Sequence, residues 1–258
     1  MQRSGSSLKP VLLLLCALGF SAGAVRAHQR DMVNADLALA VRLGERFIDL
    51  TLHLQYKEFP SLVERRAMDA DRDGWIGPQE AAAYVQEKSG RVLEAVRLTA
   101  SGQPVGLQVL GEPKLEFFGA ARVVPLHQDL TVELSSPLEL PGPDKSLLFR
   151  LDNRLEWPYP GRIVFALSAE RSLQVDSTSL DDMGQSLSRE HLRSLWFACR
   201  RRSGREVEQA IAGGEDLWRL ITYVRADNRP RIAVARLDTP ADSEIPAAGP
   251  ESSATETR

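Results

Sequence analysis

Apolar residues occupy every second position in residues 48–54, where isoleucine or leucine alternates with polar side chains. A period of two residues predicts a β-strand with one buried face. Large apolar residues recur in the same way in residues 37–41, and Gly44 lies in the join, where it can turn the chain. The two segments therefore predict a β-hairpin. His53 falls between the apolar positions, so we expect it to face solvent.

The alternation is lost beyond this hairpin. Residues 60–70 are rich in helix formers, and residues 79–89 contain three consecutive alanines with glutamates on either side. Both compositions predict helices. Two helices are therefore expected to flank the short acidic segment between them.

Short apolar segments return after Gly90, separated by turns that contain Gly or Pro. The predicted strands cover residues 93–98, 105–110, 115–118, 130–134, 147–151, 163–167 and 173–175. Many short strands at close spacing are typical of a β-sandwich. The sequence thus predicts an α+β fold: a mainly antiparallel, β-sandwich-like domain that carries a helix–loop–helix insertion and a C-terminal helical segment.

The segment after the last of these strands favours helices. Residues 188–201 predict a helix capped by Ser188, and residues 216–224 predict a second one. A weak strand is expected at residues 231–235. Residues 177–237 are therefore interpreted as a C-terminal α/β segment.

The end of the chain has a different composition. Residues 238–258 are mostly Pro, Ala, Ser, Thr and Glu, with almost no large apolar side chain. Such a segment cannot bury enough apolar surface to offset its loss of conformational entropy on ordering. We expect a disordered tail.

The first 27 residues have the features of a secretory signal peptide, with cations at Arg3 and Lys9, an apolar run over residues 11–20 and small residues up to Ala27. We expect cleavage after Ala27 and export to the periplasm or cell envelope, with no transmembrane span left in the mature chain. An uncleaved anchor is one alternative, although the run is shorter than the roughly 20 residues that cross a bilayer. Lipid attachment at Cys16 is another, although leucines precede it where small residues are usual.

Removal of the signal peptide would take away three cations and no acid, so the formal charge would change from −3 to −6. A mildly acidic protein is a poor electrostatic match for nucleic acid. Cys199 would be the one remaining cysteine, so the mature chain could form no intramolecular disulfide. Because Cys199 lies in an apolar stretch, we expect a small buried side chain and not a nucleophile.

The acidic segment between the two predicted helices matches the twelve-residue calcium loop of an EF-hand position by position. It runs from Asp69 to Glu80, and Gly74 at its sixth position permits the sharp turn that folds the oxygens around one centre. The predicted ligands of one Ca²⁺ ion are Asp69, Asp71, Asp73, the backbone carbonyl of Trp75, and Glu80. Glu80 would supply two oxygens, which gives the large coordination number that calcium accepts and magnesium does not.

The loop departs from the usual pattern at several positions. Gly77 has no side chain to act as a ligand, so a water is expected in its place, and Glu64 and Arg65 stand in the first helix where apolar residues are usual. The backbone of Ile76 would normally pair with a second calcium loop, which the sequence lacks. We therefore expect binding in the roughly 10⁻⁴ to 10⁻³ M range of extracellular modules. The alternative is an acidic turn that caps the second helix.

Four segments carry a resemblance to a known family. They are Ala27-His28, residues 50–52, residues 69–80 and residues 98–105, and the resemblance covers residues 28–176. On these segments the chain resembles a family of uncharacterised bacterial periplasmic proteins. Members are commonly labelled as periplasmic components of an ABC-type transport system, and some are encoded near metal exporters. The resemblance implies a periplasmic β-rich protein with an inserted EF-hand; the chain differs in having Gln-Arg after the histidine, where the family often has a proline and a second histidine.

Cleavage after Ala27 would make His28 the first residue, where its imidazole and the α-amine can chelate a copper ion if another histidine approaches. His53, His127 and His191 are the candidates for that partner. The alternative, which we favour, is that His28 simply begins a flexible terminus.

A basic cluster follows the predicted helix at residues 188–201. It consists of Arg200, Arg201, Arg202 and Arg205. Cations at a helix C-terminus complement the helix dipole, which is the ordinary explanation. A docking patch for anionic lipid or an acidic partner is the alternative. The turn Trp157–Pro160 is interpreted as a packing feature.

These patterns predict an exported, non-enzymatic calcium-binding protein in which the ion orders an inserted helix pair at about residues 60–90 and exposes a surface for a protein or envelope partner. An accessory protein for transition-metal transport is the first alternative, and it predicts copper or zinc binding through His28. An enzyme with an unrecognised site is the second, and it predicts a deep pocket lined by polar residues. The predicted segments are a signal peptide at 1–27, a β-rich domain at 28–176, the α/β segment at 177–237 and a tail at 238–258.

Overall fold

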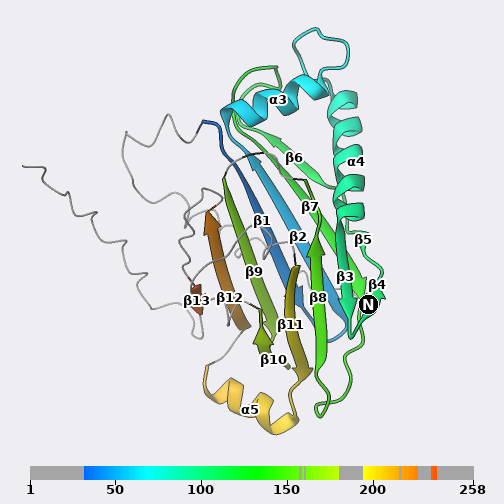
Figure 1. The fold of residues 1–258 in the computed structure, drawn as a ribbon, viewed down its shortest axis with the longest axis vertical. Coiled ribbons are helices and arrows are strands. Elements are labelled where there is room, and N and C mark those ends of the chain that lie inside the picture. The colour runs from blue at the N-terminus through cyan, green and yellow to red at the C-terminus, as the bar shows by residue number, and fades with distance from the viewer. Residues whose placement is uncertain are drawn as a thin grey trace, which may run out of the picture.

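The computed structural model describes residues 32–156, 159, 161–179, 194–214, 217–225 and 234–236. They form an α+β fold in which most strands are antiparallel and belong to two sheets. The molecule is elongated, with two helices at one end and a third at the other (Figure 1). The predicted signal peptide, His28, His191 and the predicted tail lie outside the described residues.

The larger sheet is built on the predicted hairpin. Its strands are β1 (Ala35–Leu43), β2 (Phe47–Tyr56), β5 (Gln108–Val109), β6 (Lys114–Phe117), β7 (Gln128–Pro137), β9 (Arg162–Glu170), β12 (Leu217–Arg225) and β13 (Val234–Arg236). They lie in the order β13-β12-β9-β1-β2-β7-β5, and β6 also pairs with β7. β1 and β2 pair antiparallel with Leu39 opposite Leu52, which confirms the hairpin, whereas β1 and β9 run parallel.

The smaller sheet contains β3 (Val96–Ala100), β4 (Gln103–Val105), β8 (Leu147–Asn153), β10 (Leu173–Thr178) and β11 (Ser194–Arg201). These strands lie in the order β10-β11-β8-β3-β4. The turn between β3 and β4 places Ser101 at φ +49° and Gly102 at φ +82°. Two consecutive positive φ values suit the right-handed twist of a hairpin, so the glycine there is required by the backbone.

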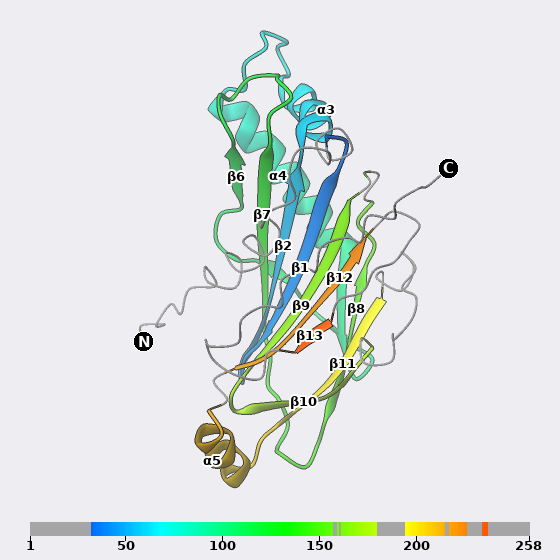
Figure 2. The ribbon, with the colours of Figure 1, turned by 90° about the vertical axis from the view of Figure 1, so that its left-hand side faces the viewer.

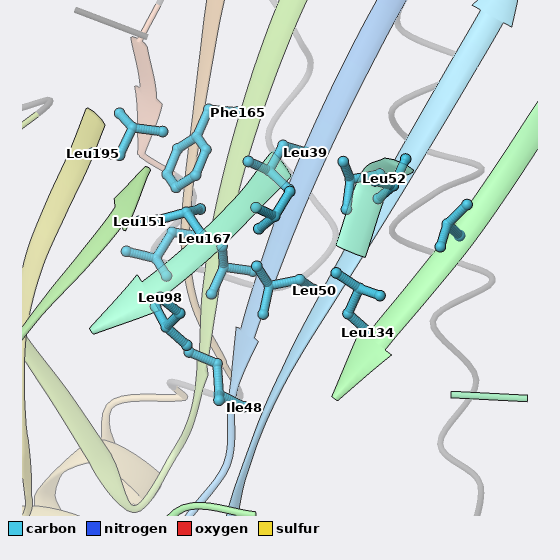
Figure 3. Packing of buried hydrophobic residues seen from close by; sticks show 14 of the residues in the cluster. Leu39, Ile48, Leu50, Leu52, Leu98, Leu134, Leu151, Phe165, Leu167 and Leu195 are labelled. Carbon is cyan, nitrogen blue, oxygen red and sulfur yellow. The ribbon is translucent and has the colours of Figure 1, made fainter. Parts of the chain in front are cut away.

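The hydrophobic core lies between the two sheets (Figure 3). From the larger sheet, Ile48, Leu50 and Leu52 on β2 are fully buried. From the smaller sheet, Leu98 on β3 and Leu151 on β8 meet them, and the same two residues are directly opposite in the β3–β8 register. Each fully buried leucine contributes roughly 1.5–3 kcal/mol to folding. The core is therefore stabilised by the burial of apolar side chains from both sheets.

Two helices follow β2 and lead into β3. They are α3 (Glu58–Met68) and α4 (Pro78–Ala95), and the third helix, α5 (Gly204–Ala212), follows β11. The helix pair predicted around the acidic segment is confirmed, although α4 continues to Ala95 and the strand predicted at residues 93–98 begins at Val96. None of the helices in the described residues is both long enough and apolar enough to cross a membrane.

The prediction of a helix at residues 188–201 is wrong in its described part, because Ser194–Arg201 form strand β11 between β8 and β10. Leu195, Phe197 and Cys199 are buried in the core, while the residues between them are partly exposed. This period of two is hidden in the sequence, since the intervening tryptophan and alanine are apolar as well. Pairing with β8 and β10 supplies the hydrogen bonds that a helix would have made within itself.

The prediction of a helix at residues 216–224 is also wrong. Residues 217–225 form β12, which pairs antiparallel with β9 along its whole length. The segment Ile221–Val224 consists of β-branched and aromatic residues, whose side chains favour the pleated surface of a sheet. The strand predicted at residues 231–235 overlaps β13 at two positions.

The strand predicted at residues 105–110 divides into two pieces. Val105 ends β4 in the smaller sheet, and Gln108–Val109 form β5 at the edge of the larger one. Gly106 lies in the step between them. A single alternating run in the sequence therefore serves both sheets.

Candidate metal centre

The acidic loop lies at one end of the molecule, between the end of α3 and the start of α4 (Figure 2). Met68 at the end of α3 and Ile76 within the loop are both buried in the hydrophobic core. Pro78 is the first residue of α4, a position where its missing N–H is not needed and its fixed φ favours the helix. Both sides of the loop are therefore anchored.

Two residues with positive φ fold the loop back on itself. Arg72 has φ +64° and Gly74 has φ +84°. An added Cβ at Gly74 would meet no atom within 4 Å, so the glycine is required by its backbone conformation and not by crowding. This agrees with the sharp turn predicted at the sixth loop position.

The three predicted aspartate ligands converge. Carboxylate oxygens of Asp69, Asp71 and Asp73 all lie within 4.8 Å of one another. Asp69 Oδ2 accepts the N–H of Gly74 at 3.1 Å, Asp71 Oδ1 accepts that of Asp73 at 3.0 Å, and Asp73 Oδ1 accepts that of Trp75 at 2.6 Å. Each carboxylate thus uses one oxygen to fix the loop, which leaves its other oxygen for a cation.

Glu80 closes the loop from the first turn of α4. Its Oε1 accepts the N–H of Ala70 at 2.7 Å, and its Oε2 accepts the N–H of Gly77 at 2.8 Å. The bond from Gly77 and then the bond from Ala70 lower the pKa of Glu80 below its usual value, so the group is ionised at neutral pH. Glu80 thus joins the start of α4 to the beginning of the loop through its two oxygens.

The most informative atom of the loop is Asp69 Oδ1. It is buried and has no hydrogen-bond donor among the described residues. A buried carboxylate oxygen without a partner costs about 1–3 kcal/mol or more, because it has lost water and gained nothing in return. A bound cation would supply the missing partner, and the carboxylates of Asp69, Asp71 and Asp73 would otherwise repel one another.

The loop backbone is paired with another part of the chain. Residues 118–127, here called the connector, join β6 to β7. The N–H of Ile76 donates to the carbonyl of Ala121 at 2.9 Å, and the N–H of Val123 donates to the carbonyl of Gly74 at 3.0 Å. Trp75 and Arg122 form an antiparallel β-bridge between them. The expectation that the loop is unpaired is therefore wrong, because the connector pairs with its backbone.

Arg65, one of the two unexpected polar residues in the first helix, holds the connector. Its side chain is fully buried, and its guanidinium donates to the carbonyls of Ala120, Arg122 and His127 at 2.8, 2.8 and 3.0 Å. It also lies 4.7 Å from the centre of the Phe117 ring, close enough for a cation–π contact. Burial lowers the pKa of Arg65, and its satisfied donors offset part of the cost of that burial.

Glu64, the other unexpected polar residue, joins the two helices to the segment between β8 and β9. Its Oε2 accepts the hydroxyl of Tyr84 at 2.7 Å and pairs with Lys88 Nζ at 2.8 Å, and its Oε1 accepts the hydroxyl of Tyr159 at 3.0 Å. Burial raises the pKa of Tyr84 and Tyr159, and the negative charge of Glu64 raises them further. No residue spacing reveals this cluster, because Tyr159 is far from the helices along the chain.

A cavity of about 450 Å³ lies beside this cluster, between α4 and β2. Its wall combines Tyr56, Glu64 and Lys88 with apolar side chains such as Leu54 and Val92. Within this wall, Glu64 pairs with Lys88 and accepts the hydroxyl of Tyr159, so these three side chains hold α3 against α4.

His53 does not face solvent as predicted. It is buried on β2, and its Nε2 lies 3.1 Å from Asp129 Oδ2 on β7. The face of the larger sheet that carries these two residues is therefore covered or closely packed at this point, which alternation alone cannot show. His127 lies in the connector, 3.2 Å from Glu58 of α3.

The basic cluster does not follow a helix, so its explanation by a helix dipole is wrong. Arg200 and Arg201 end β11, and α5 begins after them. Arg200 pairs with Glu206 at 2.7 Å and Arg201 pairs with Glu45 at 3.1 Å. These contacts join the end of β11 to α5 and to the β1–β2 turn.

Cys199 is buried, as predicted. Burial, with a smaller contribution from the charge of Asp176, raises the pKa of the Cys199 thiol to about 12. A thiol that is neutral and inaccessible at pH 7 is a poor nucleophile.

Among the residues that the structure describes, Asp69, Asp71 and Asp73 are the one group of three or more acidic, histidine or cysteine side chains close enough to hold a metal ion. Glu80 and the carbonyl of Trp75 belong to the same loop. No protein-family model matches the chain, and no curated protein matches it either.

Proposed function

We propose that residues 69–80 form an EF-hand loop that binds one calcium ion. The observation that carries this proposal is the buried Oδ1 of Asp69, which has no donor among the described residues and lies in a loop where the carboxylates of Asp71 and Asp73 converge with that of Asp69. An acidic turn whose only task is to cap α4 would need Glu80 alone. Such a cap would not require Asp69, Asp71 and Asp73, each of which has a second carboxylate oxygen left for another partner.

Calcium is the cation that suits these ligands. Every candidate donor is an oxygen, which favours a hard cation, and a carboxylate with both oxygens available favours the larger coordination number of calcium. Asp69, Asp71 and Asp73 would each give one oxygen, and Glu80 would give two. A water in place of a side chain at Gly77 would complete the set.

The geometry of the backbone supports Trp75 as the carbonyl ligand. No cis peptide bond occurs in the described residues, so each carbonyl points opposite to the N–H of the next residue. Because the N–H of Ile76 points to the connector, the carbonyl of Trp75 points away from it. The N–H of Trp75 points to the carboxylate of Asp73. In an extended residue, the N–H and the carbonyl of that residue point to the same side of the strand. The carbonyl is thereby directed to the acidic side of the loop.

The function that follows is that of an exported, non-enzymatic calcium-binding protein of the periplasm or cell envelope. The ion would order α3, α4 and the loop as an insertion between β2 and β3. Large apolar side chains are exposed around this insertion: Phe59 and Val63 on α3, Trp75 in the loop, and Phe118 and Leu126 on the connector. Exposed apolar groups that gather at one end of a molecule favour a binding surface for a partner.

Calorimetric titration of the chain with Ca²⁺ and with Mg²⁺ tests this function. We expect one calcium ion per chain and much weaker binding of magnesium. Glu80→Gln should raise the calcium Kd at least tenfold, because it removes one charge and one of two ligand oxygens. Glu87→Gln is the matched control, since Glu87 is an exposed glutamate of the same helix. Equal affinity of the two variants would refute the EF-hand.

A further inference from the structure

The connector contacts the calcium loop where a second EF-hand would otherwise be expected. Its backbone pairs with the loop through two hydrogen bonds on either side of Trp75, at Gly74 and at Ile76. The guanidinium of Arg122 also lies 4.3 Å from the centre of the Trp75 ring. This stacking restrains the Trp75 side chain, about half of which is exposed to solvent.

These contacts act directly on one predicted ligand. With the carbonyl of Gly74 held by Val123 and the N–H of Ile76 held by Ala121, the two peptide units around Trp75 cannot rotate freely. The Trp75 carbonyl is therefore aimed before any ion arrives. Fixing a ligand in advance removes an entropy cost that a free loop would meet on binding.

The connector is in turn fixed from α3. Arg65 Nη1 bridges the carbonyls of Ala120 and Arg122, one on each side of Ala121, and Nη2 holds His127 at the end of the connector. Ser61, one helical turn earlier, accepts from Arg65 Nε and donates to the carbonyl of Leu126. A fully buried arginine whose donors point to carbonyls of one segment holds that segment in a single conformation.

We propose that the connector replaces the second loop of an EF-hand pair, and that Arg65 is the positioning residue through which it sets calcium affinity. This rests on the proposed calcium function of residues 69–80. Arg65 touches no calcium ligand with its side chain; it acts through Ala121 and Val123 on the backbone of the loop. Coupling of this kind is reciprocal, so bound calcium also stabilises the connector and the exposed Phe118 and Leu126 that it carries.

Two pairs of variants test the proposal by calcium titration. Arg65→Met keeps the apolar stem and removes the bonds to the connector, and Arg66→Met is the control at the exposed neighbouring position. Val123→Pro removes the N–H that donates to Gly74, and Val123→Ala is the control that keeps it. We expect Arg65→Met and Val123→Pro to raise the calcium Kd by roughly 5- to 150-fold, and both controls to stay near wild type.

Urea unfolding in excess chelator shows separately whether each variant keeps the two sheets. If Arg65→Met fails to fold, the comparison of Val123→Pro with Val123→Ala decides the matter. Wild-type affinity in folded Arg65→Met or in Val123→Pro would overturn the role of the connector while leaving the calcium loop intact. A wild-type chain that binds no calcium would overturn the proposed function, and this proposal with it.

Discussion

The hydroxyl of Tyr84 on α4 donates a 2.7 Å hydrogen bond to Glu64 on α3, so the two helices that flank the acidic loop are joined at a buried point below it. Lys88 pairs with the same carboxylate oxygen. The spacing of the helices is thus fixed by a charge-assisted bond as well as by packing. A movement of α4 relative to α3 would therefore act directly on the contact between Tyr84 and Glu64.

Tyr84→Phe tests the contribution of that bond. The change leaves Glu64 buried with one donor fewer, and a lost hydrogen bond to a charged group costs about 1–3 kcal/mol. We expect the free energy of unfolding, measured by urea denaturation, to fall by about that amount. An unchanged midpoint would mean that water or Lys88 replaces the hydroxyl at no cost.

The ionisation of Glu80 gives the account a pH dependence. Its pKa is lowered in the folded chain by the N–H groups of Gly77 and Ala70, so its stabilising contribution is present above the usual pKa of a glutamate and is lost as pH falls through the lowered value. Calcium also needs the ionised form. We therefore expect the calcium Kd to rise as the pH falls through the lowered pKa of Glu80. Calorimetric titrations at several pH values measure this, and a Kd that stays constant at every acidic pH at which the chain remains folded would contradict it.

The sheets should not depend on the loop. Leu50 is fully buried between them, and Leu50→Ala should lower the free energy of unfolding by about 2–5 kcal/mol. Since Leu50 lies outside residues 58–95, the loss should be the same in calcium and in chelator. Urea denaturation under both conditions gives the comparison, and a loss that appears only in calcium would show that core and loop are coupled.

Cys199 provides a further test of the buried strand β11. Its thiol has a pKa of about 12 and is inaccessible, so a thiol reagent should label it at neutral pH only as fast as the protein opens. Labelling should become rapid in urea above the unfolding midpoint. Fast labelling of the native chain would mean that β11 is not packed as described.

The pattern of residues was sufficient to predict the elements whose contacts lie close together along the chain. The β1–β2 hairpin and the two helices around the loop depend on residues close together in the chain, and all three were predicted. Strands β11 and β12 were mistaken for helices because their pairing partners, β8, β10 and β9, are distant in sequence. Apolar runs without clear alternation fit either structure until those partners are known.

The same limit explains the candidate site. The spacing of Asp69, Asp71 and Asp73 predicted their convergence, because twelve residues with a glycine at the sixth position can fold in few ways. The pairing of Ile76 with Ala121 joins residues far apart in the chain, and no motif marks the connector. In the sequence, Arg65 is a departure from the EF-hand pattern. The structure explains this residue, because its guanidinium binds the carbonyl of Ala120 in the connector.

Hydrogen exchange of the wild-type chain, compared in calcium and in chelator, tests the central claim most directly. We expect calcium to increase amide protection in α3, the loop and α4, and in the connector at Val123, while β1, β2, β8 and β9 exchange equally slowly in both conditions. Protection that is identical everywhere would contradict calcium binding by residues 69–80. A chelator effect on all strands at once would contradict a local role for the ion.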